Sequence, residues 1–233
     1  MTLRINDLLR GFAWTQSAFC RKYDFENYLA TALINDSFMR RTAFAVRALN
    51  VELSQIRDLT TNETSAQMRF QFWLRLITDI FEGIEVPTAS SGSQPIAAEI
   101  QKCFLASQKT LSKRWFLCLI ESRMSSLNLS NFPFTTIKDL EVYIDSSVSP
   151  VFYIINEAAR SVWMADRKTW SNIHLKLDHI GNHVSKAQGF SNILRGISHN
   201  AVRGRCYIPS ELLVTHKLSV EQILRKTETK QMK

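Results

Sequence analysis

Apolar residues recur every three or four positions along almost the whole chain, which is the period of an amphipathic α-helix. Residues 46–56 and 70–81 show it best, and shorter stripes follow the same spacing. These stripes are Phe25, Leu29, Ala32, Leu33; Val46, Leu49, Leu53, Ile56; Phe70, Trp73, Ile77, Ile80, Phe81; Ile96, Ile100, Phe104; Leu111, Trp115, Cys118; and Ile137, Leu140, Ile144. With only 7 Gly and 5 Pro in 233 residues, a sheet protein rich in tight turns is disfavoured. The sequence therefore predicts an all-α fold.

Several helix starts are marked in the sequence. Pro95 lies where proline suits the first turn of a helix. Thr136 with Asp139, and Ser219 with Gln222, have the spacing of a capping box, in which side chains satisfy free backbone N–H groups. The pattern also predicts a long helix over residues 173–195.

Residues 86–95 and 128–135 interrupt the helical pattern and are loops by composition. Similar helical stripes lie on both sides of each loop, so neither marks a domain boundary. A chain of this length suits one hydrophobic core. We expect one helical domain over residues 23–216, followed by a basic, polar C-terminal tail over residues 217–233.

The first 22 residues carry four basic side chains and one acidic one, and several leucines share a helical face. Two interpretations fit: a mitochondrial presequence or an ordinary first helix. No stretch approaches the roughly 20 apolar residues that a membrane-spanning helix needs.

The net charge of +8 is uneven, because residues 101–233 hold 19 Lys and Arg against 10 Asp and Glu. Such a surface suits nucleic acid, anionic lipid or an acidic protein, but short same-sign runs favour the alternative of a simple solvated surface. The common nucleic-acid-binding patterns are absent, so we expect no nucleic-acid partner. The four cysteines form no C-x-x-C pair, which predicts reduced core thiols.

Residues 192–209 are the most informative stretch. They resemble a signature of the squalene/phytoene synthase family, Asn-x-Leu-Arg-Asp-x-x-x-Asp followed by Arg-Gly-Arg-x-Tyr-x-Pro. The matching positions are Asn192, Leu194, Arg195, Arg203, Gly204, Arg205, Tyr207 and Pro209. The family's other signature, Arg-x-x-Asp-x-x-x-Asp, has its counterpart at residues 44–54, where Arg47 matches.

The resemblance covers about residues 24–216 and implies a single prenyl-synthase-like helical bundle. The family domain continues for several helices beyond the position of Pro209. We therefore expect this chain to lack the last family helices and one wall of the family's cavity.

The chain departs from the family at the residues that carry its chemistry. In the enzymes, two Asp-x-x-x-Asp motifs stand on facing helices, and spacing i, i+4 places both carboxylates on one helix face. The resemblance implies that these carboxylates hold Mg²⁺, which neutralises a prenyl diphosphate. The four aspartate positions here are Asn50, Ser54, Gly196 and Asn200. We therefore expect a pseudoenzyme with no catalytic residue, no metal and no cofactor.

Two neighbouring acidic residues do not restore the motifs. Glu52 is two residues from Asn50 and points elsewhere on a helix. Asp58 lies one turn beyond Ser54 on the same side, but one carboxylate cannot replace two pairs.

The chain also resembles a degenerate branch of the same family, whose members serve the assembly of mitochondrial complex I (NADH dehydrogenase). The residues that carry this resemblance are 44–58, 68–73, 113–115 and 179–189. This resemblance implies a non-catalytic scaffold, peripheral on the matrix side of the inner membrane. Its implied partners are complex I subunits or other assembly factors, with anionic lipid contacted by the basic half. The alternatives are an isoprenoid diphosphate transferase of the squalene/phytoene synthase type and a lipid- or anion-binding protein.

Two further sets of residues are candidates for binding. Guanidinium groups match phosphate geometry, so an anion site is one interpretation of four arginines, and pairing with acids inside the bundle is the other. They are Arg47, Arg195, Arg203 and Arg205. His179 and His183, beside Asp178, have the spacing of half a metal site. No further His or Cys pair completes the site, so we expect surface or core histidines that bind no metal.

Overall fold

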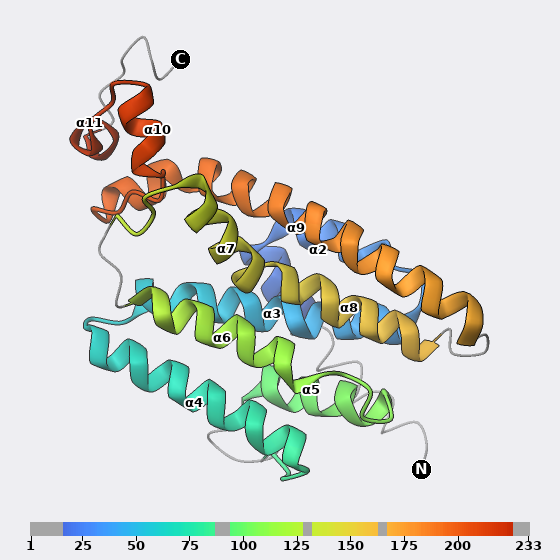
Figure 1. The fold of residues 1–233 in the computed structure, drawn as a ribbon. Helices are drawn as coiled ribbons and strands as arrows, with labels where there is room; N and C mark the ends of the chain where they lie inside the picture. Colours follow the sequence, from blue (N-terminus) through green and yellow to red (C-terminus); the bar gives the residue numbers. More distant parts are fainter. Residues whose placement is uncertain (1–15, 87–93, 128–131, 163–166, 226–233) are drawn as a thin grey trace.

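The computed structural model describes residues 16–86, 94–127, 132–162 and 167–225, with side chains of 167–172 left out. Every regular element in these ranges is a helix, which confirms the all-α expectation (Figure 1). Residues 16–23 are helical and precede α2 (Phe25–Ala32), α3 (Ser37–Leu59), α4 (Glu63–Glu82), α5 (Pro95–Ala106), α6 (Lys113–Leu127), α7 (Ile137–Ser147), α8 (Ser149–Val162), α9 (Arg167–Val202), α10 (Ser210–Thr215) and α11 (Val220–Leu224).

The helix ends follow the local chemistry of the sequence. Both expected capping boxes form, at the start of α7 and at the start of α11, and Pro95 opens α5. Helix α3 begins at a cap that the pattern did not single out, because the Asp36 carboxylate accepts the backbone N–H of Met39 at 2.8 Å. Helix α9 is longer at both ends than the predicted 173–195.

Helix α3 lies at the centre of the bundle. In Figure 1 it runs between α4 on one side and α9 on the other, and it also packs against α2, α5, α6 and α8. Its buried face includes Val46, Leu49, Leu53 and Ile56, and each large apolar side chain buried here stabilises the fold by about 1.5–3 kcal/mol. Because α3 is central, its side chains contribute both to the hydrophobic core and to the walls of the cavities described below.

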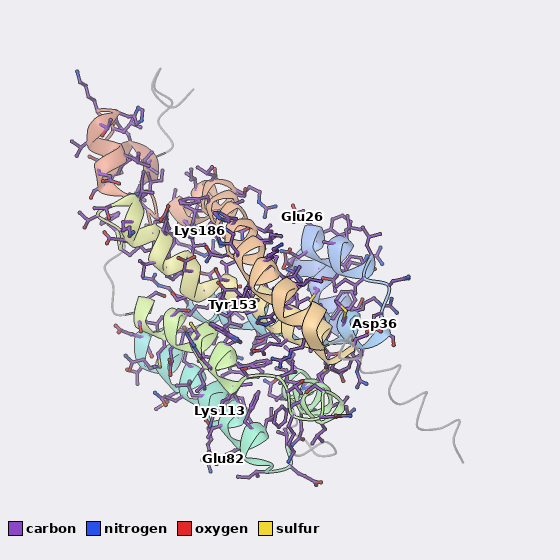
Figure 2. All side chains as sticks on the ribbon, turned by 45° about the vertical axis from the view of Figure 1, so that its right-hand side comes forward. Glu26, Asp36, Glu82, Lys113, Tyr153 and Lys186 are labelled. Atoms are coloured by element: carbon purple, nitrogen blue, oxygen red, sulfur yellow. The ribbon has the colours of Figure 1, made fainter. Side chains whose placement is uncertain are left out.

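Helices α7 and α8 hold α9 against the bundle. Helix α9 approaches α7 so closely that a Cβ atom added to Gly189 would lie 2.7 Å from Ile144 Cγ1. Nearby, the buried hydroxyls of Ser149 on α8 and Ser185 on α9 are 2.6 Å apart. Lys186 adds an exposed-side contact, with its Nζ 3.5 Å from Asp145 on α7 (Figure 2). These contacts fix the rotation of α9 about its axis.

Part of the range expected to be a basic, polar tail, residues 217–233, is helical in the structure. Within that range α11 forms, and Ile223 is buried beside Cys206 and Leu213. The residues from 226 onward lie outside the described part. At the other end, residues 1–15 of the region expected to be a presequence or first helix are also outside it, while Cys20 is fully buried in the core. Among the described helices, none has the length and apolar character needed to cross a membrane.

Candidate functional site

Two adjoining cavities separate α3 from α9. One, the Arg47 cavity, has a volume of about 470 Å³, and its lining includes Arg47, Asn50, Arg195 and Gly196. The other, the Asp58 cavity, has a volume of about 640 Å³ and reaches the turn that follows α9. The two cavities share part of their walls, namely Tyr23, Ser54, Arg123, Val148 and Asn192.

The fold brings together the four positions where the family motif has aspartate. Asn50 and Gly196 line the Arg47 cavity, Asn200 lines the Asp58 cavity, and Ser54 lines both. The Ser54 hydroxyl donates to the carbonyl oxygen of Val51 at 2.7 Å, so it is engaged with its own helix. The motif positions of α3 and α9 therefore line the same two cavities, without the carboxylates.

These residues do not fit a divalent cation. Mg²⁺ prefers carboxylate and other oxygen ligands in octahedral geometry, and the four motif positions supply amides, a hydroxyl and a glycine. Within the described ranges, no group of three or more His, Cys, Asp or Glu side chains is placed to hold a metal. The residues at this site therefore do not support Mg²⁺-dependent chemistry.

Arg123 on α6 is a site residue that the sequence analysis missed. Its guanidinium donates to Asn50 Oδ1 at 2.6 Å and to the carbonyl oxygen of Leu119 at 3.1 Å. The residue is only 9% exposed, and burial lowers the pKa of its guanidinium. A cation thus contacts the first of the four lost aspartate positions.

Arg47 is also buried in this cavity, at 7% exposure. Its guanidinium carbon lies 5.7 Å from the centroid of the Phe152 ring, and its Nε is buried without a hydrogen-bond partner. Burial lowers the pKa of Arg47, and the charge of Asp24 partly opposes that effect. Asp24 nevertheless forms no ion pair with it; its carboxylate accepts the side chain of Asn27 at 2.8 Å.

Arg195 lies nearer the surface and pairs with Glu26 on α2, which Figure 2 shows beside α9. It also donates to Asn192 Oδ1 at 2.7 Å. Both partners of the ion pair are more than half exposed, so this contact contributes at most about 1 kcal/mol.

The remaining two candidate arginines, Arg203 and Arg205, both form ion pairs with Asp58. Arg205 donates to Asp58 Oδ1 at 2.7 Å, Arg203 Nε lies 3.4 Å from the same oxygen, and His199 Nε2 lies 3.1 Å from Oδ2. Gly204 makes this possible, because its φ of 68° turns the chain so that both neighbouring arginines reach α3. Burial alone would raise the pKa of Asp58, but hydrogen bonds from His199 and Arg205 and the arginine charges hold it below its ordinary value.

The histidine pair on α9 lies apart from both cavities. His179 and His183 are exposed, with their Nε2 atoms 3.3 Å apart. The neighbouring Asp178 is engaged by Asn156 at 3.1 Å. In the part of the chain that the structure describes, this pair belongs to no candidate metal cluster.

The fold is shared with two solved prenyl synthases. A ligand-bound dehydrosqualene synthase superimposes with a TM-score of 0.72 at 17% identity, over 96% of this chain and 70% of that one. A squalene synthase, HpnC from Alicyclobacillus acidocaldarius, gives a TM-score of 0.67 at 18% identity, over 96% of this chain and 75% of that one. The family model described as squalene/phytoene synthase matches residues 20–233. The chain belongs to the squalene/phytoene synthase family. Its fold is thus the prenyl-synthase bundle that the motifs predicted.

Curated relatives carry a different name. The protein named NADH dehydrogenase (ubiquinone) complex I, assembly factor 6 of Bos taurus is 32% identical over 213 residues, covering 91% of this chain and 57% of that protein. Its Homo sapiens counterpart is 30% identical over 225 residues, covering 95% and 61%. The Drosophila melanogaster homologue is 33% identical over 205 residues, covering 88% and 56%. The chain spans about three-fifths of the length of these relatives.

Proposed function

We propose that this protein is a non-catalytic assembly factor for mitochondrial respiratory complex I and uses a degenerate prenyl-synthase bundle as a binding scaffold. The names of its curated relatives support the assembly role. The observation that carries the non-catalytic part is the contact of Arg123 with Asn50, which puts a cation where the family's chemistry requires carboxylates around a metal.

The chemistry of the site supports a scaffold better than an isoprenoid diphosphate transferase. Departure of a diphosphate requires strong neutralisation of its developing charge. Two of the family's four expected carboxylates are replaced by amides, and Gly196 supplies no ligand atom at all. Asp58 is already shared among three basic side chains, so it is not available as a metal ligand.

The proposed place of action is the matrix side of the mitochondrial inner membrane, with peripheral attachment. The proposed partners are complex I subunits or other assembly factors. The charge of residues 101–233 supports contact with anionic lipid, because each basic residue near such a surface adds about 1 kcal/mol of attraction. Residues 23–216 are the proposed scaffold domain, and a presequence within residues 1–22 stays a prediction.

Depletion and rescue test the assembly role. In cells that lack this protein, we expect the amount of assembled complex I on native gels to fall, while the amounts of the other respiratory complexes stay unchanged. Re-expression of the wild-type chain should restore the amount of complex I. The double variant Gly196→Asp with Asn200→Asp should rescue equally well, because two carboxylates on one face do not rebuild a metal site. Unchanged complex I after depletion would refute the proposal.

The enzymatic alternative is tested with the purified protein, farnesyl or geranylgeranyl diphosphate and millimolar Mg²⁺. We expect no metal-dependent release of diphosphate. Mg²⁺-dependent release of diphosphate by the purified protein would establish the transferase and remove the pseudoenzyme assignment.

A further inference from the structure

Two exposed histidines of α9 bring metal-binding nitrogens to one point. His179 and His183 are one turn apart on the helix, and their Nε2 atoms lie 3.3 Å apart. Two nitrogens that bind one tetrahedral zinc ion, each about 2.0–2.1 Å from the metal, are also separated by about 3.3 Å. A hydrogen bond between the two rings holds the nitrogens in this arrangement.

One copy of the chain supplies only half of a zinc site. A structural zinc ion takes four ligands, usually nitrogen or sulfur atoms. Asp178, which adjoins the pair in sequence, is turned toward α8, where it accepts the side-chain amide of Asn156 at 3.1 Å. Within the described ranges, no third His, Cys, Asp or Glu side chain joins the pair. The remaining two ligands would have to come from another molecule, and a second copy of this chain offers the same pair.

The histidines border a row of uncharged side chains on the outer face of α9. This helix runs along the outside of the bundle (Figure 1). The row is exposed, and its members are spaced by three or four residues: Ile180, Val184, Ala187, Ser191 and Leu194. A surface helix normally has charged or polar side chains on its outer face. Spacing that alternates between three and four residues is typical of a helix that packs along another helix.

A two-fold axis beside the histidines would bring two copies of this face together. Ile180 and Val184 directly follow the two histidines in sequence and are 56% and 46% exposed. In a symmetric pair of chains the same patch lies on both copies. Two α9 helices that cross here bury these apolar side chains against their counterparts and place four histidine nitrogens around one point.

The charges near this face permit such a contact. Between residues 173 and 202, α9 has three Lys and Arg side chains. Lys186 Nζ lies 3.5 Å from Asp145, and Arg195 pairs with Glu26. The third cation, Lys176, is exposed, where salt screens its repulsion from the same residue of a second copy.

We propose that His179 and His183 are half of a zinc site, which the same two histidines of a second copy of this chain complete. Ile180 and Val184 of both copies pack beside the metal, so that zinc joins two chains through α9. The site goes beyond the assembly role and does not depend on it, because it is measured on the purified protein.

Sedimentation velocity of the full chain in EDTA and with zinc chloride tests the site. We expect a monomer in EDTA and a dimer with zinc, at one zinc ion for two chains. His183→Gln should abolish the dimer and weaken zinc binding by at least about tenfold, because loss of even an outer-shell partner of a metal ligand costs that much. His216→Gln is the matched control, since it removes an exposed histidine at the end of α10. A monomer with zinc, a dimer in EDTA, or a zinc-dependent dimer that His183→Gln leaves intact would overturn the proposal.

A second pair of variants tests the contact between the helices. Val184→Glu places a charge between the two copies and leaves both histidines in place, so we expect a monomer even with zinc. Met68→Glu is the control, because it adds the same charge at an exposed apolar position on α4. Both positions are exposed, so circular dichroism should match the parent. A zinc-dependent dimer that survives Val184→Glu would contradict the packing of two α9 helices.

Cobalt in place of zinc reports the coordination. Co²⁺ in a tetrahedral site absorbs visible light strongly, whereas octahedral, water-bound Co²⁺ absorbs weakly, so the spectrum reports the geometry. We expect the tetrahedral spectrum in the dimer, its loss in His179→Gln and its retention in His216→Gln. An octahedral spectrum would show that water completes the coordination, and it would overturn the site of four histidines.

Discussion

Arginines line both cavities between α3 and α9, but the charges of these arginines are balanced differently in the two places. In the Asp58 cavity, Arg203 and Arg205 share one carboxylate with His199. In the Arg47 cavity, Arg47 and Arg123 have none in the part of the chain that is described. Arg205 ties the turn after α9 to α3, whereas Arg47 Nε is buried without a hydrogen-bond partner.

The difference follows from where each carboxylate lies on α3. Asp58 is two turns beyond Asn50, near the end of the helix, where the turn after α9 can reach it. At Asn50 the carboxylate is replaced by an amide that accepts one bond from Arg123. The comparison therefore predicts opposite responses to substitution in the Asp58 cavity and in the Arg47 cavity.

The largest effect is expected in the Asp58 cavity, where the arginines have an acidic partner. Asp58→Asn removes the charge that Arg205 and Arg203 share, and the free energy of unfolding should fall by about 2 to 3 kcal/mol, because two cations lose their partner in a half-buried place. Urea denaturation of parent and variant measures it. Glu221→Gln is the control, since its pair with Arg225 is exposed and its loss should change stability by less than about 0.5 kcal/mol. Equal effects of the two substitutions would show that the ion pairs of Asp58 with Arg203 and Arg205 do not stabilise the fold.

The shape of both cavities depends on how closely α9 approaches the bundle. Alanine substitutions at two glycines of α9 distinguish the cost of a steric clash with the bundle from the gain in helix propensity. Gly189→Ala should lower the free energy of unfolding by about 1 to 2 kcal/mol, because the new Cβ would overlap the side chain of Ile144. Gly181→Ala meets only ordinary contacts, 3.4 Å from Phe152 Cβ, so it should be neutral or stabilising by up to about 1 kcal/mol. Thermal unfolding of both variants checks the pair. Equal shifts would mean that α9 is not seated on α7 at Gly189.

Removal of an arginine without an acidic partner should have the opposite effect on stability. Arg123→Met removes a buried charge with no acidic partner, so the free energy of unfolding should stay unchanged or rise by up to about 1 kcal/mol. The measurement is the same urea series, made without phosphate in the buffer. A loss above about 2 kcal/mol would indicate that Arg123 is a structural cross-link like Arg205, and the contrast between the cavities would disappear.

Much of this architecture could be predicted from local signals. Capping boxes depend on residues three apart, so Thr136 with Asp139 was sufficient to find the start of α7. The motif stretches on α3 and α9 were sufficient to predict that Asn50, Ser54, Gly196 and Asn200 lie together. Both inferences use spacing along one helix or a pattern already specific for one fold.

Arg123 could not be found this way, because nothing in the neighbouring sequence marks it. It belongs to the site only because α6 packs on α3 and buries that face of the helix. The stripe that begins at Phe25 correctly predicts helix α2, but it does not show whether that face is buried, because periodicity does not say which face is covered. Phe25, Leu29 and Leu33 are all about half exposed or more, whereas Thr31 is buried. Tertiary contacts decide burial, and a single sequence does not contain them explicitly.

The smallest expected effect is a pH dependence of stability that is confined to Asp58. The pKa of Asp58 is lowered in the folded state, so its contribution to stability is fully present above the ordinary aspartate pKa of about 3.9 and is lost as the pH falls through the lower folded-state value. The stability gap between the parent and Asp58→Asn should therefore be steady near neutral pH and shrink under acid conditions. No such narrowing is expected between the parent and Arg123→Met, because that guanidinium keeps its proton throughout this range. Urea denaturation at a series of pH values from 7 down to about 3 measures both gaps, and a gap for Asp58→Asn that does not narrow would mean that its carboxylate is not held ionised by the arginines.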